Sequence, residues 1–116
     1  MDSRHLPARF YQAEGGNEPV REWLKQLEPV ERKIVGADIK TVEYGWPIGM
    51  PICRPMGKGL YEVRSNLPNG KIARVLFCIY EGNMILLHGF IKKTQKTPAQ
   101  DLDLALKRKS TLEASR

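Results

Sequence analysis

The sequence predicts an α+β fold, in which an N-terminal strand and a helical hairpin pack on a small antiparallel β-sheet and a short C-terminal helix follows. Two observations predict it. Apolar residues recur at helical spacing from residue 19 to residue 45, and from residue 60 to residue 91 they follow the period of two that strands show. With 116 residues the chain can bury one hydrophobic core but not a second one beside it, so we expect a single domain.

The N-terminal half is expected to hold the first strand and the hairpin. A short strand is predicted over residues 8–12, closed by turn residues at positions 15–17. Asn17 is expected to cap a helix that has Pro19 in its first turn and a buried face formed by Val20, Trp23, Leu24 and Leu27. A second helix is predicted from near Pro29 to Gly45, with one side formed by Val30, Ile34, Ala37 and Val42.

The C-terminal half begins at residues 45–59, where three prolines and two interior glycines predict an ordered loop without regular structure. Strands are predicted over residues 60–65, 72–80 and 84–91, joined by turns at 67–71 and 81–83. Thr97 is expected to cap the last helix, with Pro98 in the first helical position, Gln100 in a capping box and basic residues 107–109 at its end. The helices would then cover one face of the sheet and leave the other for a partner.

Charge and composition narrow the class of protein. Residues 1–56 hold eight Lys and Arg against eight Asp and Glu, whereas residues 57–116 hold eleven against five, so the second half carries the whole net charge of +6. Such an excess fits either a nucleic-acid partner or a well-solvated surface. The apolar stretches are too short for a membrane span and the N-terminus has no secretory signal, so a cytoplasmic protein is expected. Two cysteines, Cys53 and Cys78, make neither a disulfide framework nor a zinc site, and we expect no metal or cofactor.

Period-two alternation sorts the charged strand residues into faces. Glu62 and Arg64 share a side with Leu60, and Arg74 lies in an otherwise apolar run with Ile72, Leu76, Cys78 and Tyr80. Arg74 therefore either pairs with Glu62 across the strands or lines a wet face that binds phosphate. His88 is expected to share a face with Met84, Leu86 and Phe90, either as a packed, hydrogen-bonded residue or as a group that titrates near a basic loop.

That basic loop directly precedes the predicted last helix. It reads Lys92-Lys93-Thr94-Gln95-Lys96-Thr97, so three lysines are interspersed with polar side chains. A helix N-terminus has free N–H groups and partial positive charge and ordinarily favours acidic residues, so lysines at this place indicate an anion site. The alternative is a solubilising loop.

The chain contains no phosphate-binding glycine loop, no His and Cys cluster with metal-ligand spacing and no nucleophile elbow. What remains is a surface of Arg and Lys with one His and one Glu in reach. Such a set suits cleavage of RNA by its own 2′-hydroxyl, because cations stabilise the phosphorane while a base and an acid move protons.

Three segments carry a resemblance to a known family: GKGLYEVR at residues 57–64, ARVLF at 73–77 and LLHGFIKKTQKTP at 86–98. Over residues 8 to about 109 the chain resembles the RelE/ParE superfamily of toxins from type II toxin–antitoxin systems, in particular its phage-derived HigB-like branch. The resemblance implies one RelE-like toxin domain over residues 1–116 and a ribosome-dependent mRNA endonuclease. It also implies a helix-turn-helix antitoxin as partner, with operator DNA bound only through the toxin–antitoxin complex.

The resemblance also implies roles for single residues. The phosphate-binding arginine corresponds to Arg74, its counterpart on the preceding strand to Arg64, and the basic residues after the last strand to Lys92, Lys93 and Lys96. Some relatives end in a His or Tyr that this C-terminus lacks, so His88, Glu62 or a lysine is expected to move the proton. The expected catalytic residues are Arg64, Arg74, Lys93, His88 and Glu62; the expected RNA contacts are Lys58, Lys92, Gln95 and Lys96.

Two other functions fit the same fold and charge. One is a toxin that poisons DNA gyrase without cutting RNA, and the other is a non-enzymatic phage or operator-binding protein that contacts the DNA backbone. The endonuclease hypothesis predicts that Arg74→Ala abolishes toxicity and leaves the protein folded.

Overall fold

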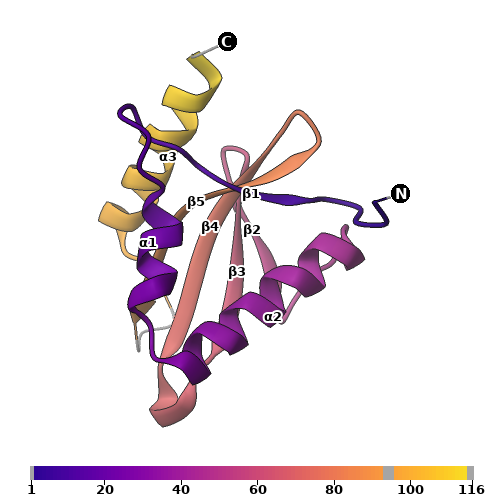
Figure 1. The fold of residues 1–116 in the computed structure, drawn as a ribbon, viewed down its shortest axis with the longest axis vertical. Helices are drawn as coiled ribbons and strands as arrows, with labels where there is room; N and C mark the ends of the chain where they lie inside the picture. Colours follow the sequence, from indigo (N-terminus) through magenta and orange to yellow (C-terminus); the bar gives the residue numbers. More distant parts are fainter. Residues whose placement is uncertain (1, 93–95, 115–116) are drawn as a thin grey trace.

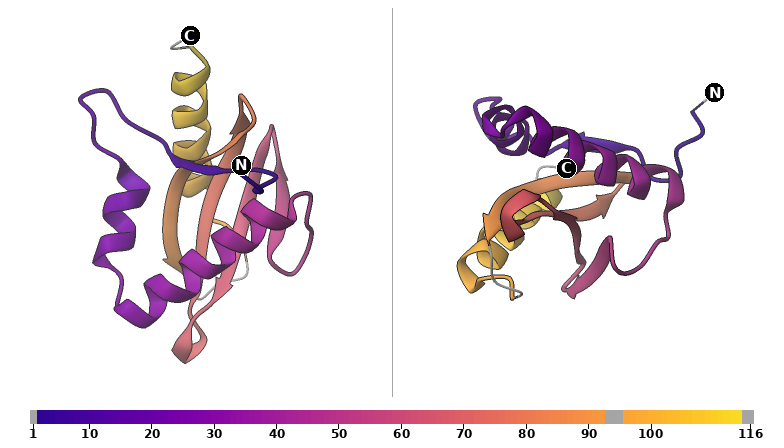
Figure 2. Two further views of the ribbon diagram at one scale, coloured as in Figure 1. Left: turned by 45° about the vertical axis from the view of Figure 1, so that its right-hand side comes forward. Right: turned by 90° about the horizontal axis from the view of Figure 1, so that it is seen from below.

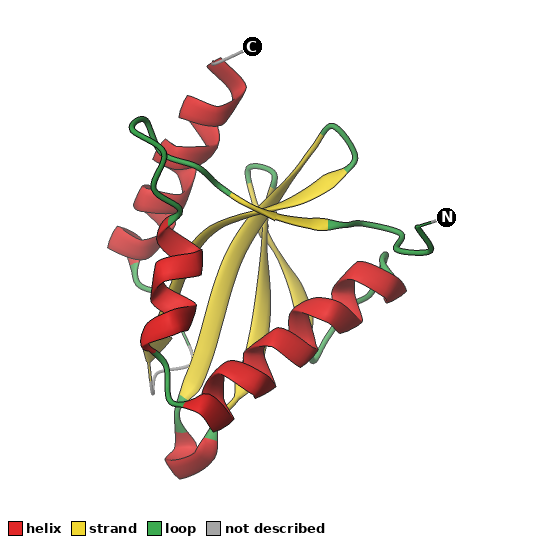
Figure 3. Ribbon diagram, in the orientation of Figure 1, coloured by secondary structure: helices red, strands yellow, loops and turns green. Residues whose placement is uncertain are grey.

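A computed structural model describes residues 2–92 and 96–114 (Figure 1). The elements follow in the order β1 (Ala8–Phe10), α1 (Pro19–Gln26), α2 (Pro29–Gly45), β2 (Cys53–Gly57), β3 (Leu60–Asn66), a 3-10 turn (Pro68–Gly70), β4 (Ile72–Tyr80), β5 (Asn83–Lys92) and α3 (Ala99–Ala114). The strands form one sheet in the order β1-β5-β4-β3-β2. Only β1 runs parallel to its neighbour, β5; the other described pairs are antiparallel. The predicted α+β class is confirmed, and the arrangement is consistent with a RelE-like fold (Figure 3).

Helices lie on both faces of the sheet. The α1–α2 hairpin covers one face and α3 lies against the other (Figure 2). The prediction that all helices share one face was wrong, because β4 is apolar on both sides. Ala73, Val75 and Phe77 pack in the cluster under the hairpin, while Leu76 and Cys78 pack with Ala105 of α3. We call the second of these surfaces the α3 face.

The hairpin helices have nearly the predicted bounds but different contacts. Glu18, and not Asn17, occupies the cap position of α1. In α2 the buried positions are Glu31, Val35, Ile39 and Val42, whereas the predicted Val30 is 55% exposed. The predicted stripe was rotated because Glu31 is drawn inward: it forms a reciprocal capping box with Glu28 and an ion pair with Lys71 of the β3–β4 turn.

Strand β2 occupies part of the segment that the sequence assigned to a loop, so that assignment was wrong. Pro55 is tolerated within it because β2 is the last strand of the sheet, where a missing N–H breaks no ladder on the outer side. The strand places Arg54 directly opposite Glu62. This pairing brings a further arginine to the α3 face.

A β-bulge in β5 sets the direction of His88. Leu76 pairs with His88 and Phe77 pairs with Leu86, so Leu87 is an extra residue between them. Met84 and Leu86 therefore pack under the hairpin, while Leu87 and Phe90 pack on the α3 face. The prediction that His88 and Phe90 share a face with Met84 and Leu86 was wrong, since the extra residue reverses the alternation.

Helix α3 starts one residue later than predicted. The carbonyl of Pro98 accepts hydrogen bonds from the main-chain N–H groups of Asp101 and Leu102, so Pro98 and not Thr97 lies in the cap position. The helix continues past residue 109 to Ala114. Thr97 is thereby free to turn its side chain toward the sheet.

Gly89→Ala is expected to destabilise the protein by about 1–3 kcal/mol, because a Cβ there would lie 2.6 Å from Cζ3 of Trp23 on α1 and overpack the core. Gly36→Ala is the matched control. A Cβ at this exposed position of α2 meets nothing within 4 Å, so alanine should stabilise the helix by up to about 1 kcal/mol. Urea unfolding measures both, and equal free energies for the two variants would contradict the packing of α1 on β5.

The Lys71–Glu31 pair is expected to make stability depend on acid pH. Lys71 Nζ lies 2.6 Å from Glu31 Oε2 and, with the N–H of Glu28, holds the pKa of Glu31 below its ordinary value against the opposing effect of burial. A lowered pKa gives stability above the unfolded-state pKa that is lost as the pH falls through the folded-state pKa. The melting temperature of Lys71→Met should therefore lie below that of the wild type at neutral pH, and the gap should close as the pH falls through the folded-state pKa of Glu31. A gap that stays constant would exclude this origin.

Candidate functional site

The strand register gathers the charged residues on the α3 face in two adjacent rows. One row across β2 to β5 comprises Arg54, Glu62, Leu76 and His88. The next comprises Arg64, Arg74 and Phe90. The sheet therefore brings Arg64, Arg74, Glu62 and His88 to one region, as alternation predicted for the first three.

Arg54 and Arg74 lie beside the carboxylate of Glu62, and Arg64 lies directly opposite Arg74 in the next row; we call these three arginines the arginine cluster. Glu62 and Arg74 are both fully buried. Nη2 of Arg54 lies 3.3 Å from Glu62 Oε1, and Nε of Arg74 lies 4.0 Å from Glu62 Oε2. The Arg74–Glu62 pairing, expected as one of two alternatives, is present, but Arg54 is the closer cation.

The electrostatics of Arg74 reflect this crowding. Burial lowers the pKa of Arg74, Glu62 opposes the shift, and the positive charges of Arg64 and Arg54 add to it. Three guanidinium groups and one carboxylate thus share this region. A bound anion would relieve the remaining positive charge.

Thr97 closes Glu62 from the helix side. Its hydroxyl donates a hydrogen bond of 2.5 Å to Glu62 Oε2, in the range of strong bonds to a carboxylate. Glu62 is consequently held between a hydroxyl and an arginine and has no exposed surface. This contact accounts for the burial of Thr97, for which the sequence suggested only a capping role.

One helical turn further on, Asp101 holds His88. Asp101 Oδ1 lies 2.7 Å from His88 Nε2, and the imidazole stacks on Phe90 with ring centroids 5.4 Å apart. The first turn of α3 thus carries the acidic residue that a helix start favours, and uses it to orient a histidine.

Arg108 supports the bulge from the same helix. Its Nη1 donates to the carbonyl of Leu87, the extra residue of β5, at 2.7 Å. A bulged residue leaves the sheet ladder locally disrupted, so this bond fixes the backbone directly before His88.

The predicted lysines fall in different places. Lys58 lies exposed in the β2–β3 turn, Lys92 ends β5 and is exposed, and Lys96 is exposed before α3. Lys93 and Gln95 lie outside the described residues, and with them the centre of the basic loop. Sequence reasoning missed Arg54, Thr97 as a partner of Glu62, and Asp101. For Asp101, the available signal in the sequence was an acidic residue four positions after Thr97, in the first turn of the predicted helix.

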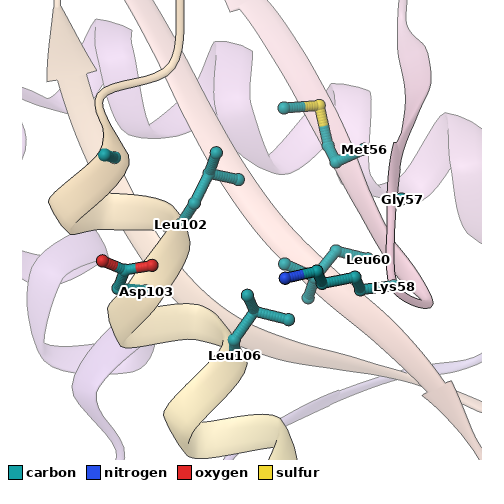
Figure 4. Close-up of a pocket in the computed structure, with 8 residues that line it drawn as sticks. Met56, Gly57, Lys58, Leu60, Leu102, Asp103 and Leu106 are labelled. Atoms are coloured by element: carbon teal, nitrogen blue, oxygen red, sulfur yellow. The ribbon is translucent and has the colours of Figure 1, made fainter.

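A groove of about 300 Å³ adjoins the cluster, between the β2–β3 hairpin and α3 (Figure 4). Its walls are mostly apolar and come from Met56, Leu60, Leu102 and Leu106, with Lys58 and Asp103 as its charged residues. Within residues 2–92 and 96–114, no three His, Cys, Asp or Glu side chains gather into a group able to hold a metal ion. In the same part of the chain, no helix combines the length and apolar character that a membrane span requires.

The part of the chain that forms this site matches a known protein family. The model of the phage-derived Gp49-like protein family (DUF891) matches residues 22–110, which include the end of α1, all of α2, strands β2 to β5 and most of α3. No curated protein matches the sequence. The chain therefore belongs to the phage-derived Gp49-like family, a RelE/HigB-like family associated with the toxins of toxin–antitoxin systems.

Proposed function

We propose that the protein is the toxin of a type II toxin–antitoxin system and a metal-independent endoribonuclease that cuts mRNA on the ribosome. The observation that carries the proposal is the arginine cluster on the α3 face, built around the buried carboxylate of Glu62, with His88 in the same row as Arg54 and Glu62. Family membership supports the toxin role and suggests an antitoxin partner. We propose a helix-turn-helix protein for that partner, with operator DNA bound only by the complex.

The reaction proposed is attack of a ribose 2′-oxygen on the adjacent phosphorus. The 2′-O–P bond forms as the 2′-hydroxyl proton passes to a base, and the P–O5′ bond breaks as the departing 5′-oxygen takes a proton from water. The products are a 2′,3′-cyclic phosphate and a 5′-hydroxyl. Negative charge grows on the phosphorane oxygens, and preorganised cations stabilise it most effectively where water is excluded. Arg64 is partly exposed and opposes the fully buried Arg74, while Arg54 is also partly exposed but is held by its ion pair with Glu62. In this proposal Arg64 therefore contacts the phosphate, and Arg74 and Arg54 add positive potential beside it.

Glu62 positions the arginines. Its carboxylate has no exposed surface and already accepts hydrogen bonds from Thr97 and Arg54, so it reaches no substrate in this arrangement. We therefore assign to His88 the proton-transfer role for which the sequence also suggested Glu62.

His88 is the proposed general base. It pairs with Leu76 beside the Arg74–Phe90 pair, which makes His88 and Arg74 diagonal neighbours about 7–8 Å apart. With Nε2–H donating to Asp101, a neutral imidazole has its lone pair on Nδ1, and that nitrogen accepts the 2′-hydroxyl proton. Lys58, Lys92 and Lys96 contact the RNA backbone in this proposal, as do Lys93 and Gln95.

The test is transcript-end mapping after induction of the protein in growing cells, together with cleavage of a defined mRNA on purified ribosomes. The proposal predicts new 5′-hydroxyl ends within translated codons. Intact transcripts with DNA-damage signalling would instead identify a gyrase poison. Intact transcripts without toxicity, together with salt-dependent DNA binding, would identify a non-enzymatic DNA-binding protein.

His88→Asn is expected to slow cleavage at least about 100-fold, the lower bound for loss of a positioned general base. His5→Asn is the matched control, since His5 is the second of the two histidines and is exposed at the opposite end of the chain. Single-turnover cleavage on ribosomes measures both. Equal rates for the two variants would remove His88 from the reaction.

A further inference from the structure

The groove beside the arginine cluster has the character of a ligand site. Leu60, which is 2% exposed, forms its buried base, and Met56 on one side faces Leu102 and Leu106 on the other (Figure 4). Its volume of about 300 Å³ lies at the lower end of the range for small-molecule sites. A flat aromatic group fits such a slot, and the Met56 thioether makes favourable contacts with an aromatic ring.

The two charged residues of the groove lie on opposite sides of it. Lys58 extends from the β2–β3 turn toward α3, and Asp103 lies on the helix across the gap (Figure 4). Lys58 has a left-handed backbone conformation (φ 55°) between two glycines that also have positive φ, which gives the turn its tight shape. The ligand should therefore carry negative charge near Lys58 and a hydrogen-bond donor near Asp103.

The groove lies beside the arginine cluster on the same face of the sheet. Met56 lies two residues after Arg54, and Leu60 lies two residues before Glu62, so all four share the α3 face. Two residues along a strand span about 7 Å. A group bound at the cluster and a group in the groove are thus neighbours on one continuous surface.

We propose that this groove binds one base of the RNA next to the cleaved phosphate and selects bases with an exocyclic amino group. The inference rests on the proposed endonuclease function and adds its base preference. The carboxylate of Asp103 accepts hydrogen bonds from an amino group, as carboxylates do from the N4 of cytosine, while Lys58 contacts the flanking phosphate. Proteins that read single-stranded RNA hold splayed-out bases in this manner. Uracil, which has no amino group, is the disfavoured base.

The experiment compares cleavage profiles over a library of mRNAs in which the nucleotides around the cut vary. Wild-type protein should prefer an amino-bearing base over uracil at one position. Asp103→Asn should reduce that preference at least about fivefold, because an amide both donates and accepts. Leu106→Trp, which fills the groove, should lower cleavage at the preferred sites toward that at the poorest sites. Asp38→Asn on α2 is the matched control and should leave the profile unchanged.

The outcomes separate this inference from the proposed function. If wild-type protein does not cut RNA, the endonuclease function fails. If it cuts and neither groove variant alters the profile, the base site is overturned while the endonuclease stands. Weaker antitoxin binding by both groove variants, with an unchanged profile, would assign the groove to the protein partner and also overturn the base site. Because Asp103 is exposed, its variant should melt as the wild type does.

Discussion

Arg64→Ala is expected to cut mRNA on ribosomes about 10²–10³-fold more slowly than the wild type, the loss typical of removing one charge-stabilising donor. Arg64 is the member of the arginine cluster that combines partial exposure with a position directly opposite Arg74. Its removal should therefore reduce stabilisation of the phosphorane and leave the melting temperature within a few degrees of the wild type. Single-turnover cleavage and thermal unfolding measure the two effects.

Two controls sharpen this result. Arg64→Lys keeps the charge but loses the planar fork, so it should recover only part of the rate. Arg21→Ala removes an exposed arginine from α1 on the other face and should cut at the wild-type rate. A fully active Arg64→Ala would place the phosphate site elsewhere.

Arg74→Ala is a poorer test of the phosphate site than Arg64→Ala. Arg74 is fully buried, so its truncation should destabilise the protein, contrary to the expectation from sequence that this variant stays folded.

Glu62→Ala is expected to lower the free energy of unfolding by about 3–5 kcal/mol, the cost of removing one partner from a buried ion pair. The variant would leave the buried Arg74 without its carboxylate, remove the acceptor of the Thr97 hydroxyl and release Arg54. A protein of this size has a total stability of only about 5–15 kcal/mol, so a large unfolded fraction is expected at growth temperature. Urea unfolding measures the loss.

The matched control is Glu22→Ala, the same truncation at an exposed carboxylate of α1 that pairs with Lys25 at 3.6 Å. It should change stability by no more than about 0.5 kcal/mol. Glu62→Gln, which keeps the shape and an acceptor for Thr97, should fall between the two. If Glu62→Ala were as stable as Glu22→Ala, the carboxylate would not hold the arginine cluster together.

The sequence predicted the strands well where one physical rule decided the structure. The alternation of apolar residues located β3, β4 and β5 to within a residue or two, and β4 at its observed bounds. It failed at β2, because prolines and glycines indicate a loop unless the strand is known to be the last in its sheet, which is a tertiary property. With β2 unassigned, Arg54 had no predicted neighbour.

Part of the candidate site could also be predicted from the alternation of strand residues. Glu62, Arg64 and Arg74 come together because adjacent antiparallel strands align their faces. The contacts to α3 could not be predicted, since nothing in the local sequence states against which face a helix will pack. Thr97 and Asp101 acquire their roles only when α3 packs on β4 and β5, which brings Asp101 to His88 and the preceding Thr97 to Glu62.

The bulge at Leu87 implies a constraint on how this family can diverge. Removing Leu87 would restore plain alternation along β5. The residues between the β4–β5 turn and the bulge would then lie on the opposite face of the sheet from the one they occupy now, relative to His88 and Phe90. Substitutions within β5 preserve this arrangement, whereas a single-residue insertion or deletion does not. Among relatives that retain the site, we expect the distance from the turn at Gly82 to the histidine to be fixed in length even where the side chains between them differ.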